Sequence, residues 1–143
     1  MPLNAMMNHR EMVDTMMQGD LFSQWLGIEI LETAPGYARI SMKVRADMVN
    51  GFGICHGGIS FSLADSVFAF ASNSYGEQCV SIDTSINHLK PIRVDDILTA
   101  TSLEINKGKS LRLYEVTITN QNSEKVAWFK GTVFNTGKIW AQK

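Results

Sequence analysis

Hydrophobic positions along the chain change their period, and each change marks a border between a helical and an extended part. Residues 8–19 carry methionines and a valine at helix-like intervals, which predicts a short amphipathic helix. The apolar residues within 21–26 continue this part as an apolar turn or a second helical turn. The chain is therefore expected to begin with a helical segment that has one apolar face.

The rest of the chain alternates mostly between apolar and polar residues, as strands with one buried face do. In the second of these stretches Ala38, Ile40 and Met42 fall on one face, which is expected to point inward. Tight turns separate the later stretches, whereas residues 136–143 receive no assignment. Six strands are predicted, over residues 28–32, 37–44, 78–89, 97–106, 111–120 and 126–135.

One apolar stretch, residues 59–71, interrupts the alternation and predicts a helix that is buried on nearly all sides. A glycine-rich entrance precedes it, with Gly57 and Gly58 at the expected helix start. The stretch contains one carboxylate, Asp65, and an unpaired buried carboxylate is costly. Asp65 is therefore expected to have either a structural partner, such as a nearby serine or a neighbouring strand, or a chemical role.

The order of the elements predicts an α+β fold in which an antiparallel sheet packs on one long helix. A single sheet face covers only part of a helix that is apolar nearly all round. A second copy of the chain, related by two-fold symmetry, is expected to cover the rest.

Composition narrows the class of protein further. The 143 residues fit a single domain, with its core over about residues 25–136. The formal net charge of −1 gives no electrostatic reason to expect nucleic acid or a membrane as a partner. The two cysteines, Cys55 and Cys79, form neither a disulfide framework nor a metal-binding spacing. With no signal peptide and no apolar stretch of ~20 residues, a cytoplasmic location without a bound metal is expected.

The glycine-rich entrance, the helix and the following strand together carry a recognisable motif. It consists of Asn50-Gly51, His56-Gly57-Gly58, Ser62-Leu63-Ala64-Asp65, Asn73, Ser81-Ile82-Asp83 and Pro91. This motif resembles that of the hotdog-fold acyl-CoA thioesterases, in particular the PaaI group of the phenylacetate pathway, to which thioesterase superfamily member 2 is also similar. The resemblance implies a sheet wrapped around the helix, pairs of subunits that share one sheet, and often dimers of such dimers.

The resemblance also implies roles for individual residues beside a thioester substrate. Asp65 would be the essential carboxylate, and the backbone amide of Gly57 would donate a hydrogen bond to the oxyanion. Asn50 and His56 would support them, and the hydroxyl of Ser81 would help to hold the water. Coenzyme A, which is part of the substrate rather than a separate cofactor, would contact four further residues: Gly58, Lys90, Lys107 and Lys109.

The spacing of Gly57 and Asp65 adds a geometric condition. A helix start presents unpaired N–H groups and the positive end of the dipole, which suit a carbonyl oxygen that develops negative charge. Asp65 could act as a general base toward water or as a nucleophile. Eight residues separate the two positions, which is ~12 Å along one helix. If both act on one carbonyl, they must come from different subunits.

Other chemistry has less support in the sequence. Cys55 and His56 have the residue types of a nucleophile–base pair, but adjacent side chains rarely aim at each other. His88 and His9 are interpreted as incidental. The leading hypothesis is hydrolysis of an aromatic acyl-CoA, such as phenylacetyl- or hydroxyphenylacetyl-CoA, or of a medium-chain one. The alternatives are a hydratase or dehydratase, whose histidine–acid motif is missing here, and a non-catalytic module that binds acyl-CoA.

Overall fold

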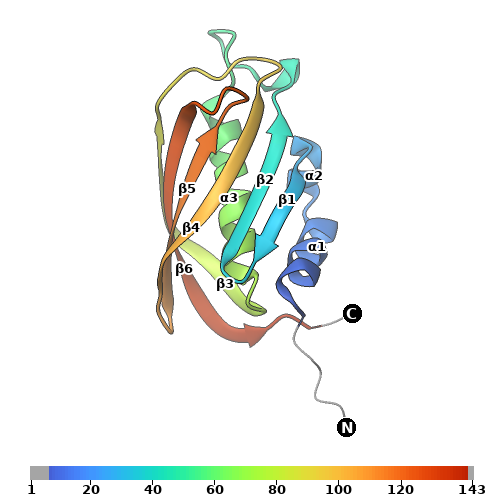
Figure 1. Ribbon diagram of the computed structural model, residues 1–143, viewed down its shortest axis with the longest axis vertical. Coiled ribbons are helices and arrows are strands. Elements are labelled where there is room, and N and C mark those ends of the chain that lie inside the picture. Colours follow the sequence, from blue (N-terminus) through green and yellow to red (C-terminus); the bar gives the residue numbers. More distant parts are fainter. Residues whose placement is uncertain (1–6, 142–143) are drawn as a thin grey trace.

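The computed structural model describes residues 7–141, which form three α-helices and six strands (Figure 1). The helices are α1 (His9–Gly19), α2 (Leu21–Leu26) and α3 (Gly57–Asn73), and a short 3-10 helix spans Ala46–Met48. The strands are β1 (Glu29–Ala34), β2 (Tyr37–Lys43), β3 (Glu77–His88), β4 (Ile97–Lys107), β5 (Leu111–Thr119) and β6 (Lys125–Ile139). All six belong to one antiparallel sheet, in the order β1-β2-β4-β5-β6-β3. None of the described helices is long and apolar enough to cross a membrane, and the cytoplasmic location stays a prediction.

The sheet curves around α3, which runs along its inner side (Figure 1). Leu63, Val67 and Phe68 of this helix are at most 1% exposed, so the core lies between the helix and the sheet. The two pack closely at Gly131 of β6, where a Cβ atom would lie 2.7 Å from Cζ of Phe68. Ala38 of β2 points inward as predicted and is fully buried. The α+β hotdog arrangement expected from the sequence is confirmed.

The two N-terminal helices cover part of the α3 surface that the sheet leaves open. Met12 and Val13 of α1 and Leu26 of α2 are fully buried. The chain itself thus supplies part of the cover that was expected to come from a second copy. One stripe of α3 stays at least partly exposed, with its members three or four residues apart and therefore on one face. The stripe consists of Gly58, Ser62, Asp65 and Ala69.

The strand boundaries agree with the prediction to within two residues, except at the end of β6. This strand continues to Ile139, through residues that the sequence left unassigned. Its end is fixed by Trp140, whose backbone N–H donates to the carbonyl oxygen of Gly76 at 2.9 Å. The indole Nε1 of Trp140 also donates to Oδ1 of Asn73 at 2.9 Å, across 67 positions of sequence. No local pattern could predict a strand that depends on such distant contacts.

β3 lies at an edge of the sheet, and within residues 7–141 it pairs with β6 alone. Val80 and Ile82 on this strand are 50% and 56% exposed. The pairing with β6 shifts its register between Ser81 and Asp83, which is a β-bulge. The edge that faces away from β6 therefore offers unpaired backbone groups and apolar side chains.

Candidate active site

The first turn of α3 leaves one backbone amide available. His56 is the N-cap residue, and its Nδ1 accepts a hydrogen bond from the N–H of Gly58 at 2.9 Å. The first N–H groups of a helix have no acceptor within the helix. The cap satisfies Gly58, whereas the N–H of Gly57 has no acceptor among residues 7–141. The helix start thus presents the Gly57 amide, with the positive end of the helix dipole behind it.

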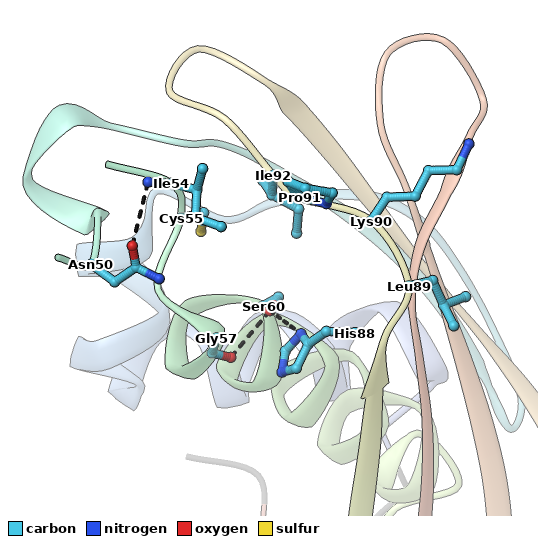
Figure 2. A pocket seen from close by; sticks show the side chains of 10 residues that line it. All are labelled: Asn50, Ile54, Cys55, Gly57, Ser60, His88, Leu89, Lys90, Pro91 and Ile92. Carbon is cyan, nitrogen blue, oxygen red and sulfur yellow. Dashed lines mark hydrogen bonds between the residues drawn. The ribbon is translucent and has the colours of Figure 1, made fainter. Parts of the chain in front are cut away.

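A cavity of about 320 Å³ opens beside this amide (Figure 2). It lies between the start of α3, the loop that precedes α3 and the segment that follows β3. In Figure 2 Gly57 and Ser60 border it from the helix, His88 stands beside them, and Lys90 extends outward. The structure therefore brings together Asn50, Gly57 and Lys90 of the predicted site residues. The full lining is Asn50, Ile54, Cys55, Gly57, Ser60, His88, Leu89, Lys90, Pro91 and Ile92.

Asn50 holds the loop that forms one side of this cavity. Its Oδ1 accepts hydrogen bonds from the backbone N–H groups of Phe52 at 2.9 Å and Ile54 at 3.4 Å. Such a bond from a side chain to its own following backbone stabilises a turn. The side-chain nitrogen of Asn50 donates to no acceptor in the described part of the chain, which leaves it for a ligand.

Asp65 lies eight residues further along α3 and is half-buried. The nearby serines, which were its expected structural partners, bond elsewhere. Ser62 Oγ donates to the carbonyl oxygen of Gly58 at 2.7 Å, and Ser66 Oγ shares a hydrogen bond with Ser23 Oγ at 2.8 Å. Among residues 7–141 no group forms a hydrogen bond with the Asp65 carboxylate. A purely structural explanation of Asp65 through a serine is therefore not observed.

The environment of Asp65 makes it a stronger base. Burial raises the pKa of the Asp65 carboxyl, and the negative charge of Asp20 raises it further. Asp65 does not line the Gly57 cavity, and Ser81 lies exposed on β3, also outside it. Within one chain, the residues expected to activate and hold water are thus separated from the amide expected to bind the oxyanion.

A second hollow of about 400 Å³ meets the helix start from another side. Its helix residues, Gly58 and Ile59, are turned by about 100° and 200° from Gly57 around the helix axis. The rings of Phe22 and Trp25 stack at its edge with centroids 5.9 Å apart. The lining is Phe22, Trp25, Asp47, Met48, Val49, His56, Gly58 and Ile59, so the predicted residues His56 and Gly58 belong here.

The three predicted lysines lie in different places. Lys90 borders the Gly57 cavity, and its Nζ forms an ion pair with Glu124 at 2.7 Å. Nζ of Lys107 lies 3.8 Å from the ring centroid of Tyr75, which follows the C-terminal end of α3. Because a helix of 17 residues is about 25 Å long, Lys107 lies far from Gly57 within one chain. Lys109 is exposed in the turn between β4 and β5.

Cys55 and His56 do not form a nucleophile–base pair. The thiol of Cys55 lies 3.6 Å from the carbonyl oxygen of His56, while the imidazole Nδ1 accepts from Gly58. Burial, and after it the charge of Asp96, raises the pKa of the Cys55 thiol to about 11, so little reactive thiolate forms. Residues 7–141 also contain no group of three or more histidine, cysteine, aspartate or glutamate side chains that could hold a metal ion.

His88, which the sequence indicated as incidental, belongs to the Gly57 cavity. Its Nδ1 lies 3.4 Å from Ser60 Oγ, and its Nε2 lies 3.0 Å from the place of a Cβ atom at Gly57. A histidine at the end of an exposed strand gives no signal of this kind in the sequence. Only the approach of β3 to the start of α3 places the ring there.

Comparison with known proteins identifies the family of the chain. The family model described as the thioesterase superfamily matches residues 52–127. The acyl-coenzyme A thioesterase PaaI of Escherichia coli is 40% identical over 122 residues, which cover 85% of this chain and 87% of that protein. The human acyl-coenzyme A thioesterase 13 is 29% identical over 120 residues, 82% of this chain and 86% of the relative.

Solved structures give the same result. The E. coli PaaI protein from the phenylacetic acid degradation operon has a TM-score of 0.90 and 37% identity, over 92% of this chain and 95% of that one. A hypothetical thioesterase of Streptococcus pneumoniae, solved with coenzyme A, has a TM-score of 0.76 and 32% identity, over 79% of this chain and 88% of that one. The resemblance expected from the motif is confirmed, and the chain belongs to the thioesterase superfamily.

Proposed function

We propose that the chain is an acyl-CoA thioesterase, which hydrolyses a thioester to a free acid and coenzyme A without a separate cofactor. The observation that carries the proposal is the Gly57 amide, which lacks an acceptor in residues 7–141 and opens onto a cavity at the start of a 17-residue helix. A thioester has a good leaving group, so its hydrolysis chiefly needs an activated water or nucleophile and a stabilised oxyanion. Relatives that are named acyl-coenzyme A thioesterases support this assignment.

The Gly57 amide would bind the thioester carbonyl oxygen as it becomes an oxyanion. The amide is fixed at a helix start before the substrate arrives, and donors that are fixed in this way stabilise the transition state strongly. The unused side-chain N–H of Asn50 faces the same cavity and can contact the substrate. His56 would contribute indirectly, because its bond to Gly58 holds the turn in which the Gly57 amide lies.

Asp65 would act from the partner subunit, either as general base toward water or as nucleophile. Its distance from Gly57 along α3 is ~12 Å, too far for both to reach one carbonyl carbon. A two-fold axis between antiparallel α3 helices would bring Asp65 of one subunit opposite Gly57 of the other. The raised pKa of Asp65 supports the base, because a carboxylate that holds protons more readily accepts one from water more readily.

Two features support a dimer with this geometry. The exposed stripe of α3 has Asp65 near its middle and otherwise only glycine, serine and alanine, which allow a second helix to come close. The β3 edge, with Val80 and Ile82 exposed, could pair with the β3 edge of a second copy and continue the sheet.

Dimers could pair further through the outer face of the sheet. Val80, Leu111 and Phe134 form an exposed apolar row across β3, β6 and β5, because Phe134 is the register partner of both other residues. They are 50%, 51% and 42% exposed, and such rows often become contacts between subunits. We expect the tetramer to form there.

Ser81 would reach the site in the dimer and help to hold the water. It lies exposed on β3, the strand proposed to pair across the interface. The S. pneumoniae thioesterase has also been solved with an aspartate or a threonine replaced by alanine, and these two lie sixteen positions apart. Asp65 and Ser81 have the same spacing, and both threonine and serine carry a hydroxyl, which supports the pairing of roles.

The two hollows would separate the parts of the substrate. The hollow with stacked Phe22 and Trp25 suits an aromatic acyl group, and the operon of the E. coli relative supports phenylacetyl or a hydroxylated form. The coenzyme A arm would occupy the Gly57 cavity, with Lys90 at its border toward the phosphates. Lys107 and Lys109 would come from the partner, because antiparallel α3 helices with its Asp65 opposite Gly57 let the C-terminal end of its α3 extend ~12 Å past Gly57.

Release of free thiol from a panel of acyl-CoA esters tests the proposal. Asp65→Asn should lower turnover by ~10²–10⁴-fold, the usual contribution of a general base, and turnover by the wild type should be fastest with aromatic acyl groups. Asp14→Asn is the matched control, since the Asp14 side chain on α1 is 47% exposed and, within residues 7–141, pairs only with a surface arginine. Hydrolysis that is unaffected by Asp65→Asn would contradict the mechanism, and tight binding of acyl-CoA without hydrolysis would favour the non-catalytic module.

A further inference from the structure

His88 is the last residue of β3, and its ring forms the wall of the cavity beside Gly57 (Figure 2). A Cβ atom at residue 57 would lie 3.0 Å from Nε2 and 3.3 Å from Cε1 of this ring. The φ angle of Gly57 is not positive, so the backbone conformation alone does not require glycine there. A side chain at position 57 would therefore press against the imidazole, which lies within reach of anything bound at the Gly57 amide.

The hydrogen bonds of Ser60 indicate which nitrogen of the His88 ring carries the proton. Ser60 is buried, and its Oγ lies 3.1 Å from the carbonyl oxygen of Gly57 and 3.4 Å from Nδ1 of His88. A serine hydroxyl has one proton to donate, and we assign it to the shorter of the two bonds. Ser60 then accepts from the Nδ1–H of His88. A neutral imidazole with its proton on Nδ1 has Nε2 as an acceptor.

This acceptor has no donor within residues 7–141. Other polar side chains around the cavity are donors: the side-chain nitrogen of Asn50, and the ammonium group of Lys90, which is paired with Glu124. The Gly57 amide is a donor as well. A ligand with an acceptor oxygen for Gly57 and an N–H group for His88 would therefore complement the cavity.

A coenzyme A thioester carries both groups at a suitable spacing. Its first amide N–H is separated from the thioester sulfur by only two methylene groups, so it lies one short arm away from the carbonyl oxygen. We propose that Nε2 of His88 accepts a hydrogen bond from this amide while the Gly57 amide holds the carbonyl. The inference rests on the thioesterase function proposed above, and it assigns His88 to recognition of the thiol side of the substrate.

Two small thioesters test this assignment directly. One is the acyl thioester of N-acetylcysteamine, which keeps the amide; the other is that of 2-mercaptoethyl acetate, which has an ester oxygen in place of the N–H. Wild type should prefer the amide by roughly three- to tenfold in kcat/KM, the effect of one neutral hydrogen bond. In His88→Phe, which keeps a flat ring but no acceptor, the preference should disappear.

Two further variants keep the test decisive. His88→Gln retains an acceptor oxygen and should retain part of the preference, and His9→Phe, on α1 and away from the cavity, should retain all of it. An equal preference in wild type and His88→Phe would overturn the assignment, as would a wild-type preference for the ester, which would mean that Nε2 carries the proton. Failure of the wild type to hydrolyse any acyl-CoA would reject the thioesterase function itself, and the role of His88 with it.

Discussion

The start of α3 allows one hydrogen-bond donor to be removed while the helix keeps its shape. Gly57 is the first residue of the helix, where proline is well tolerated because the N–H has no acceptor within the helix. His56 before it has φ −61° and ψ 135°, the extended conformation that residues adopt before proline. Gly57→Pro should therefore fold, with the amide proton deleted.

Gly57→Ala is the matched control, because it keeps the N–H. Both variants place a Cβ atom near the ring of His88, 3.0 Å from Nε2 before any adjustment, so they share the steric effect. Proline also puts Cδ in place of the amide hydrogen, so the difference between the variants reports the loss of this donor together with the filling of the space in front of it. Loss of one oxyanion donor lowers kcat by ~10²–10³-fold, or about 2.7–4 kcal/mol, and we expect Gly57→Pro to be slower than Gly57→Ala by this factor. Steady-state thiol release with one acyl-CoA measures it, and thermal melting checks that both variants fold.

The same variant tests whether two subunits share a site. Gly57→Pro and Asp65→Asn chains should each be nearly inactive alone. In a heterodimer of the two, one site would combine the intact Gly57 of one chain with the intact Asp65 of the other. Random mixing of equal amounts gives half heterodimers, each with one working site of two, so we expect about a quarter of wild-type activity.

Two results would refute this reasoning. Gly57→Pro with the activity of Gly57→Ala would show that the amide does not stabilise the oxyanion. A refolded or co-expressed mixture with no more activity than the mean of its separate components would show that the sites are not shared.

Two other predictions concern pH and stability. Because the carboxylate form of Asp65 is the reactive one, kcat/KM should fall as the pH drops through the pKa of Asp65. Asp20→Asn removes a negative charge that raises this pKa, so the acid limb of the pH–rate profile should move to lower pH. An acid limb that stays in place would contradict the effect of Asp20 on Asp65. Gly131→Ala should lower the free energy of unfolding by ~1–3 kcal/mol, since the new Cβ atom would lie 2.7 Å from the ring of Phe68. Urea unfolding at fixed protein concentration measures it, with Gly19→Ala, which has open space around it, as the control that should change little.

The parts of the fold that the sequence predicts are those with a local cause. The inward positions of β2 follow from strict alternation, and α3 follows from an apolar period of 3.6 residues. The extension of β6 depends instead on Trp140 and its bonds to Asn73 and Gly76, which local patterns do not contain. The cover of α3 by α1 and α2 also depends on contacts between segments far apart in the sequence, so the sequence predicted a second copy in their place.

The candidate site also contains residues that the local sequence predicts and residues whose place depends on distant contacts. The helix start at Gly57 and the interior position of Asp65 are local features of one segment, and the sequence predicts both. His88 and Lys107 depend on where strand ends lie in space. The end of β3 approaches Gly57 and brings His88 into the cavity, whereas Lys107 lies over Tyr75 near the other end of α3. Residue type alone therefore missed His88, whereas the contact of Lys107 with coenzyme A stays a prediction.

The bulge in β3 bears on how a newly made chain avoids aggregation. An open edge with apolar residues such as Val80 and Ile82 can recruit strands of other unfolded or half-folded chains without limit. Between Ser81 and Asp83 the strand departs from a regular ladder, and Asp83 adds an exposed charge at that point. The kink disfavours the addition of many strands to a flat, extended sheet. The identical β3 strand of one partner has the same kink and can pair with this edge. The edge is thus suited to a closed pair of chains and unsuited to a growing fibril.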